Sequence, residues 1–355
     1  MNLFEKTLNG IKPADRDAEI RAAKRLDSLI KPIGSLGELE NIAVKLAGIT
    51  GKVHNKIQKK CVVVMSADNG VCEEGVSACP QSVTAVQTAN ILKGVAGISV
   101  LCRHAGSDLR VVDIGIKEDL NYKGLLKKKV GYGTSNMSKG PAMSAEETVK
   151  CIEAGTEIVN ELVTEGYNLL GTGEMGIGNT STSSAILMGF TGAAADMAVG
   201  KGAGMTDEAF EKKKKIIEKA IEINIPDRNN PLDVLSKVGG FDIAGMAGCF
   251  LGAAYNRVPI VVDGFISAAA ALTAYRLNPL VKDYMLPSHL SAEPGYKCIM
   301  DIIGLDPILN LNMRLGEGTG CPLAFGIIEA SVKIINEMAS FEDMEMDGDF
   351  LIDIR

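Results

Sequence analysis

The chain has 355 residues, of which 46% are hydrophobic and 23% charged. This composition is that of a globular protein with room for about two domains, and it excludes a disordered or low-complexity chain. Lys and Arg number 37 and Asp and Glu 44, which gives a net charge of −7. An acidic chain argues against a nucleic-acid-binding protein, because such proteins usually present a basic face.

Cysteine and histidine usage argues against a metal site. The eight cysteines form no C-x-x-C pair, and only three histidines are present, so a zinc motif cannot be assembled from neighbouring ligands. The N-terminal MNLFEKTLNG lacks the shape of a signal peptide, and no run of 18 uninterrupted apolar residues occurs. We therefore expect a cytoplasmic protein with reduced thiols, without a structural zinc site or a membrane span.

The first 50 residues predict two helices. Apolar residues recur at helical spacing over 18–30, and Pro32 and Gly34 then interrupt the pattern. Ser35 and Glu38 are spaced as a capping box for a second helix, which continues with apolar residues on one face to about residue 50.

A strand, a helix and a second strand follow in that order. The run CVVVMSA at 61–67 is apolar without alternation, as is typical of a strand buried on both faces. A single helix is predicted over 82–104, with Gly106 as its C-terminal glycine. The run LRVVDIGI at 109–116 is the next strand. This βαβ order predicts a parallel sheet.

The rest of the chain continues the alternation of helices and strands. Ser144 and Glu147 form a capping box for a helix that runs to about residue 165, and Thr206 caps another helix. That helix carries four successive lysines, 212–215, which we interpret as a solvated face. The remaining predicted elements are strands at 168–171 and 259–267 and helices at 179–188 and 322–341.

Four Gly-rich polar segments could carry chemistry, because each stands where a strand ends or a helix begins. The first follows the strand at 61–67, where Asp68 either orients a ligand or only builds an Asp-Asn-Gly turn. The third, PSHLSAEPG at 287–295, offers Ser291 to a phosphate, and His289 there is either a base or a structural residue. In the fourth, RLGEGTG at 314–320, Glu317 stands between two glycines and could act as a general base or simply precede a helix.

The second segment, GTGEMGIGNTSTS at 171–183, contains a literal G-x-G-x-x-G. A dinucleotide fingerprint should be followed by a second βα half with an acidic residue about 20 positions on, and none is evident. Glycines followed by Asn179 and Thr180 at a helix start instead predict a phosphate site, for a monophosphate as well as a pyrophosphate.

Taken together, these segments resemble the nicotinate-nucleotide–dimethylbenzimidazole phosphoribosyltransferase family of cobalamin biosynthesis. The resemblance covers nearly the whole chain and is carried by RLDSLIKPIGSLGELE at 25–40, ADNGVCEEGVSACPQSVT at 67–84, GTGEMGIGNTSTSSA at 171–185, VGGFDIAGMAG at 238–248, VVDGFISAAAA at 261–271, SHLSAEPG at 288–295 and MRLGEGTG at 313–320.

The resemblance implies a Rossmann-like α/β fold with a mostly parallel sheet and flanking helices, over 50–310. It also implies a small helical domain built from both chain ends, 1–49 and 311–355, and a homodimer. The reaction it implies transfers the phosphoribosyl group of nicotinate mononucleotide to 5,6-dimethylbenzimidazole or a related base, giving α-ribazole 5′-phosphate and nicotinate, without a metal or a cofactor.

The resemblance also assigns roles to residues. The general base is Glu317. Nucleotide and phosphate binding falls to Gly173, Glu174, Gly176, Gly178, Asn179, Thr180, Gly202 and Ser291, and base binding to Ser77, Gln87 and Leu315.

One position departs from the family pattern. Many members carry Asp-His-Gly where this chain has Asp68-Asn69-Gly70, so a benzimidazole, a purine or a phenolic base are all compatible with the sequence. Two other functions stay open as alternatives: a nucleotide-dependent oxidoreductase and a non-catalytic nucleotide-binding protein.

Overall fold

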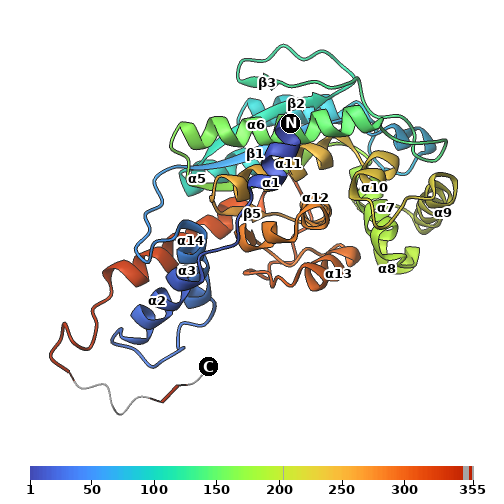
Figure 1. Cartoon of the computed structure of the whole chain (residues 1–355). Coiled ribbons are helices and arrows are strands. Elements are labelled where there is room, and N and C mark those ends of the chain that lie inside the picture. The colour runs from blue at the N-terminus through green and yellow to red at the C-terminus, as the bar shows by residue number, and fades with distance from the viewer. Residues whose placement is uncertain (203, 347–351, 354–355) are drawn as a thin grey trace.

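The protein is built around one parallel sheet with helices on both sides (Figure 1). The computed structural model describes residues 1–202, 204–346 and 352–353. Six strands of this part of the chain are hydrogen-bonded in the order β3-β2-β1-β4-β5-β6. This is the doubly wound order, in which the chain direction across the sheet reverses between β1 and β4. The α/β fold expected from the sequence is confirmed.

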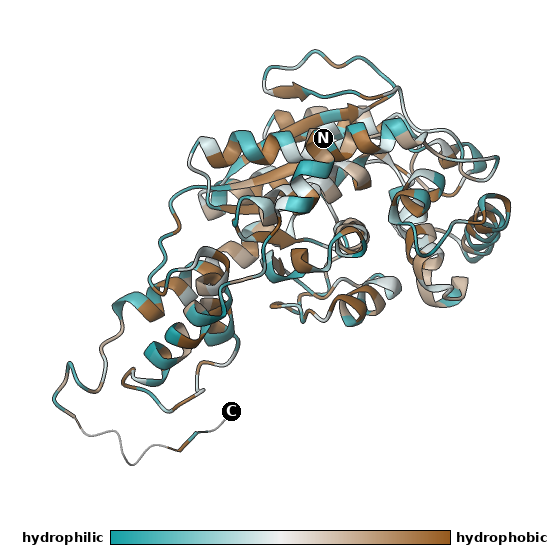
Figure 2. Cartoon of the chain, viewed as in Figure 1, coloured by the Kyte–Doolittle hydropathy of each residue, from teal (hydrophilic) through white to brown (hydrophobic). Residues whose placement is uncertain are grey.

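The six strands all run parallel, and the central ones are rich in apolar residues (Figure 2). In β1, every residue from Cys61 to Ala67 is buried, so both faces of the sheet are covered. The central register pairs Val64 with Val111 on one side and with Gly173 on the other. The strands are β1 (Lys60–Ala67), β2 (Asp108–Gly115), β3 (Leu125–Lys127), β4 (Leu169–Met175), β5 (Ile260–Val262) and β6 (Met285–Pro287).

Two groups of helices pack against the strands. One group is α11 (Phe241–Tyr255) and α12 (Phe265–Leu277), and α6 (Ala145–Thr164) packs in turn on α11. The other is α4 (Val83–Leu92), α5 (Gly97–Ala105) and α14 (Gly320–Glu337). Further helices surround them: α7 (Asn179–Thr191), α8 (Ala195–Ala198), α9 (Asp207–Asn224), α10 (Pro231–Val238) and α13 (Pro294–Ile303), with the short 3₁₀ turns η1 (Gly70–Glu74) and η2 (Pro279–Tyr284).

The Gly- and Ala-rich stretch at 239–274 contributes to close helix packing inside the protein. Every residue of α11 from Phe241 to Ala254 is buried, as expected for a helix that is apolar on all sides. A Cβ added at Gly248 would lie 2.0 Å from the carbonyl oxygen of Ile152, and one added at Gly155 would lie 2.0 Å from that of Gly245. These glycines therefore allow the backbones of α6 and α11 to touch.

The two chain ends meet beside the sheet. Helices α2 (Arg16–Asp27) and α3 (Glu38–Thr50) pack on each other and on α14, below the main body in Figure 1. Ala22, Leu26, Ala47 and Ile335 form part of a separate small apolar cluster there. Helix α1 (Leu3–Gly10) packs instead against α6 and α11. The division into 50–310 against 1–49 with 311–355 remains a prediction.

Most elements predicted from the sequence are present with shifted ends. The Ser144–Glu147 capping box, the Thr206 cap and the Gly106 terminus are confirmed. The helix predicted over 82–104 is two helices, which a turn at Gly94 separates. The strand predicted at 168–171 continues to Met175, and the one at 259–267 ends at Val262 because Phe265 already opens α12.

Two local predictions are wrong. Ser35 does not cap a helix: α3 begins at Glu38 after Gly37, which has φ +53° and no side-chain cap. Glu40 accepts the Leu36 N–H (2.9 Å) and pairs with Lys31 instead (2.8 Å). The run 212–215 is not wholly solvated either, because the side chain of Lys213 points into the protein and is fully buried.

One segment, Val83–Ala105, is long and apolar enough to cross a membrane by length and composition alone. In the fold it is the pair α4 and α5, which packs against β1 and β2. Core helices pass the same test, so this segment is weak evidence for a membrane span.

Candidate active site

A cavity of about 290 Å³ lies at the carboxyl ends of β4, β5 and β6. Small-molecule sites usually occupy about 300–1,000 Å³, and in open α/β sheets they lie at this edge. The cavity adjoins a second hollow of about 990 Å³, which shares Gly202, Glu293, Arg314 and Leu315 with it. Together they leave room for a ligand of nucleotide size.

The fold brings the site residues predicted from the sequence to this one place. Eleven of the twelve line the cavity: Ser77, Gln87, Glu174, Gly176, Gly178, Asn179, Thr180, Gly202, Ser291, Leu315 and Glu317. Gly173 does not. It supports the wall from behind, since a Cβ there would lie 2.4 Å from the Glu317 carbonyl oxygen.

Glu317 is held in an uncommon backbone conformation. Its φ is +62°, between Gly316 at +82° and Gly318 at +89°. A non-glycine residue in the left-handed region is strained by about 1–3 kcal/mol and persists only where its surroundings fix it. The side chain is 5% exposed. Oε1 accepts from Gln87 Nε2 at 2.6 Å, and Oε2 accepts from the Ile98 N–H in the first turn of α5 at 3.2 Å.

A second carboxyl group lies directly behind Glu317. Oε1 of Glu174, at the end of β4, accepts the Glu317 N–H at 3.2 Å. The Asn179 amide donates to Oε2 of Glu174 and to Oδ2 of Asp242, the latter at 3.1 Å. Burial, reinforced by the nearby Asp242 charge, raises the pKa of Glu174 to about 8, and burial raises the pKa of Asp242 to about 6. Glu174 is therefore largely protonated at neutral pH.

The start of α7 also lines the cavity. Gly178 precedes it with φ +92°, and no side chain caps it. Lys213 Nζ donates to Thr180 Oγ1 and to the Gly200 carbonyl, both at 2.9 Å. Because Thr180 accepts from a cation, its own O–H is free to donate to a ligand. Burial lowers the pKa of Lys213 to about 8.

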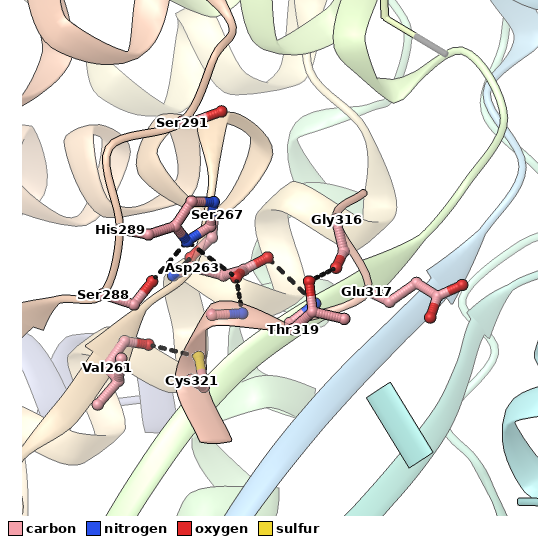
Figure 3. Close-up of polar contacts among 12 residues, drawn as sticks. Val261, Asp263, Ser267, Ser288, His289, Ser291, Gly316, Glu317, Thr319 and Cys321 are labelled. Atoms are coloured by element: carbon pink, nitrogen blue, oxygen red, sulfur yellow. Dashed lines mark hydrogen bonds and ion pairs between the residues drawn. The ribbon is translucent and has the colours of Figure 1, made fainter. Parts of the chain in front are cut away.

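The third wall carries Asp263 and His289 (Figure 3). Asp263 follows β5 and is buried. Its carboxylate accepts the N–H groups of Gly318 (3.1 Å) and Gly320 (2.7 Å). His289 Nδ1 lies 3.0 Å from Ser288 Oγ and 3.8 Å from Asp263 Oδ1. Burial raises the pKa of Asp263, and the imidazole of His289 opposes that shift.

Sequence reasoning missed several residues of the site. Asp263, Glu293, Arg314 and Lys213 were not singled out, and Asp263 was placed inside the strand predicted at 259–267, whereas β5 ends at Val262. Asp68 was weighed as a ligand residue, but it does not line the cavity. It accepts the Lys117 N–H at 2.8 Å. Asn69 is fully buried behind the site, next to Gly176 and Gly240.

A doubly wound sheet, a glycine-lined helix start and buried carboxyl groups at one edge together define an α/β protein with a nucleotide-type site. A family model described as "Phosphoribosyltransferase" matches residues 11–346. The chain belongs to the nicotinate-nucleotide–dimethylbenzimidazole phosphoribosyltransferase family, and this confirms the resemblance seen in the sequence. Its class is that of the pentosyltransferases.

The relatives match this chain over nearly its whole length. A nicotinate-nucleotide–dimethylbenzimidazole phosphoribosyltransferase of Clostridium tetani is 56% identical over 356 residues, covering 100% of this chain and 98% of its own. One of Geobacter sulfurreducens is 49% identical over 352 residues, covering 99% and 100%. A crystal structure of such an enzyme from Thermus thermophilus superposes with a TM-score of 0.89 at 37% identity, covering 94% of this chain and 99% of that chain.

Proposed function

We propose that this protein transfers the 5-phosphoribosyl group of nicotinate mononucleotide to 5,6-dimethylbenzimidazole or a related base in cobalamin biosynthesis. The products are α-ribazole 5′-phosphate and nicotinate. The observation that carries the proposal is the Glu317 carboxylate, which is fixed on the wall of the cavity by Gln87 and the Ile98 N–H, in a cavity that the start of α7 also lines. The family membership of the chain supports the same reaction.

The chemistry requires one base and no acid. Nicotinate leaves from a pyridinium as a ring that needs no proton. The attacking imidazole nitrogen bonds to C1′ from the opposite face, so the configuration inverts from β to α. The other ring nitrogen then loses its proton, and a positioned carboxylate that accepts it typically contributes about 10²–10⁴-fold. Glu317 Oε1 and Oε2 each keep a lone pair for that N–H.

The nucleotide end is held by separate groups. The uncapped start of α7 presents backbone N–H groups and the positive end of the helix dipole, which suits a phosphate. Thr180, Gly202 and Ser291 also line the cavity, and the buried ammonium of Lys213 donates to Thr180. Holding the base and C1′ in line supplies the remaining part of the rate enhancement.

A product assay tests this function. Purified protein is mixed with nicotinate mononucleotide and, separately, dimethylbenzimidazole, benzimidazole, adenine, phenol and p-cresol, and the mixtures are analysed by liquid chromatography and mass spectrometry. We expect free nicotinate together with a new α-ribotide, and the panel ranks the bases. Absence of product from every base would contradict the proposal and favour a binding protein. The same proposal includes a homodimer in the cytoplasm, which size-exclusion chromatography with light scattering tests for its oligomeric part.

A further inference from the structure

The loop that carries Glu317 needs an anchor, because its backbone is not one that the sequence adopts on its own. Three successive residues, 316–318, have positive φ. Gly316 and Gly318 tolerate this conformation, whereas Glu317 does not without strain. Local hydrogen bonds contribute: Thr319 Oγ1 donates to the Gly316 carbonyl at 2.8 Å. These bonds shape the turn, but they do not fix it relative to the sheet.

Asp263 supplies a connection from β5 to the end of this loop, in addition to the bond from Glu174 on β4 to the Glu317 N–H. Its Oδ2 accepts the Gly318 N–H and its Oδ1 accepts the Gly320 N–H, so one carboxylate bridges the residue that follows Glu317 and the first residue of α14 (Figure 3). Charged acceptors make hydrogen bonds to backbone N–H groups about twice as strong as neutral ones. The bridge is short and enters the loop from the end of β5, which is part of the rigid core.

Asp263 is held in place through its backbone N–H, and an imidazole lies near its carboxylate. Its own N–H donates to Ser267 Oγ at 3.1 Å, and Ser267 Oγ is 2.7 Å from Thr172 Oγ1 on β4. His289 Nδ1 stands 3.8 Å from Oδ1. The side chain of Asp263 is 2% exposed. A buried carboxylate that accepts two backbone N–H groups restricts the movement of its partners, and catalytic groups must be held within about 0.5 Å of their working geometry.

We propose that Asp263 is a positioning residue for the general base: it holds the 316–320 loop so that the Glu317 carboxylate stays at Gln87 and at the start of α5. This inference rests on the proposed function, because it assigns the base role to Glu317. The claim that Asp263 anchors the loop does not rest on that function, since the anchoring can be measured without turnover.

The kinetic test uses Asp263→Asn. Asparagine has the shape of aspartate, but an NH2 donor replaces one of the two oxygens that accept N–H groups of the loop. We expect kcat to fall about 10- to 100-fold, the loss typical of a misplaced catalytic group, while KM for nicotinate mononucleotide changes less than about threefold. In a Glu317→Gln background the same substitution should change kcat by less than about threefold, because residues that act as one unit are not additive. An equal loss in both backgrounds, or wild-type kcat in the single variant, would overturn the proposal.

Asp113→Asn is the matched control. Asp113 is also a buried carboxylate near the end of a strand, where Oδ1 accepts the Ile116 N–H at 3.0 Å, but it lies on β2 away from Glu317. We expect this variant to keep wild-type kcat. If Asp263→Asn does not fold, Ser267→Ala leaves the carboxylate in place and removes the acceptor of the Asp263 N–H. It should then show a smaller, kcat-only loss with the same non-additivity, and additive behaviour would count against the proposal.

Hydrogen exchange measured by mass spectrometry tests whether Asp263 anchors the loop. The peptide over 313–325 should exchange faster in Asp263→Asn than in wild type, and at the wild-type rate in Asp113→Asn. Unchanged exchange in that peptide would show that Asp263 does not hold the loop. If instead exchange changes as expected but wild-type protein makes no product, the proposed function fails while the anchoring stands.

Discussion

The backbone N–H of Glu317 donates a hydrogen bond to Oε1 of Glu174 at 3.2 Å. The two carboxyl groups of the cavity therefore have different tasks, although both belong to the same wall. Glu174 is buried and its pKa is raised to about 8, so it serves as a neutral support. Glu317 presents its carboxylate to the cavity, between Gln87 and the first turn of α5. Environment, and not residue type, separates their roles.

Replacing Glu317 with Gln should abolish most of the turnover while leaving the fold intact. The amide keeps the size of the side chain and an acceptor for the Ile98 N–H, but it cannot take the proton of the attacking base. We expect kcat to fall by about 10²–10⁴-fold, with binding of dimethylbenzimidazole largely retained. Nicotinate release gives kcat, and calorimetry gives the binding constant.

Glu329→Gln provides the control for that experiment. Glu329 also belongs to α14, but it pairs with Lys60 at the surface, 2.6 Å away, and does not line the active-site cavity. It should keep wild-type kcat. Wild-type turnover in Glu317→Gln would show that another group is the base.

Local sequence patterns predicted the elements well where one physical rule dominates. The apolar run of β1 and the capping box at Ser144 and Glu147 are examples. The sequence predictions fail where contacts between distant segments determine the local structure. Ser35 and Glu38 match a capping box, yet α3 begins only at Glu38, and the Glu38 carboxylate accepts from Asn41 in the first turn of the helix. Nothing local marks Lys213 as the one buried lysine of its run, because its burial depends on Thr180 and Gly200 from other segments.

The candidate site also combines residues that local sequence reveals with residues that only the tertiary structure reveals. Residues in Gly-rich segments were found from the sequence, since glycines and polar groups at strand ends are visible there. Asp263 was missed because its importance lies in two N–H groups more than 50 positions away, at Gly318 and Gly320. Only the arrangement of β5 and α14 brings them together.

The raised pKa of Glu174 predicts how stability depends on pH. Between pH 4.5, its ordinary value, and about 8, the folded protein holds a proton at Glu174 that the unfolded chain releases. The free energy of unfolding therefore falls as pH rises through this window and levels off above it. Glu174→Gln removes this contribution, so its Tm should decline less between pH 5 and 8 than that of the wild type.

The readout of that experiment is the slope, because the substitution also changes the bond to Asn179 at every pH. Thermal unfolding is followed by circular dichroism at several pH values. Glu329→Gln, at the surface, should give a curve parallel to the wild type. If Glu174→Gln is parallel as well, Glu174 does not carry the proton assigned to it.

Lys213→Met should weaken binding of the nucleotide. Methionine preserves the apolar stem but removes the ammonium that donates to Thr180 and Gly200. Hydrogen bonds to charged groups contribute about 1.5–3 kcal/mol, so we expect KM for nicotinate mononucleotide to rise about 10- to 100-fold. In the wild type, KM should also rise above pH 8, because the lowered pKa lets Lys213 lose its charge there.

Lys212→Met tests whether position within the lysine run matters. Lys212 is exposed, so its loss should leave KM and its pH profile unchanged. An equal effect of the two substitutions would indicate that general positive charge, and not the buried ammonium, acts on the nucleotide.

Gly173→Ala should displace the catalytic loop from the sheet. A Cβ at this position would lie 2.4 Å from the carbonyl oxygen of Glu317 and 2.9 Å from Cα of Gly318. Both are backbone atoms, so no side-chain rotation relieves the contact, and overpacking of this kind costs about 1–3 kcal/mol. We expect a lower Tm and a kcat reduced at least about tenfold, since small displacements of a catalytic group are costly.

Gly326→Ala is the matched substitution, because it lies inside α14 with no atom within 4 Å of the added Cβ. Alanine in a helix interior is favoured over glycine by about 0.5–1 kcal/mol, so this variant should keep its kcat and gain stability. Thermal unfolding and steady-state kinetics of the two variants, measured together, separate the effect of contact with Glu317 from that of adding a methyl group. A Gly173→Ala enzyme with wild-type kcat would mean that the loop and β4 do not need to touch for Glu317 to act.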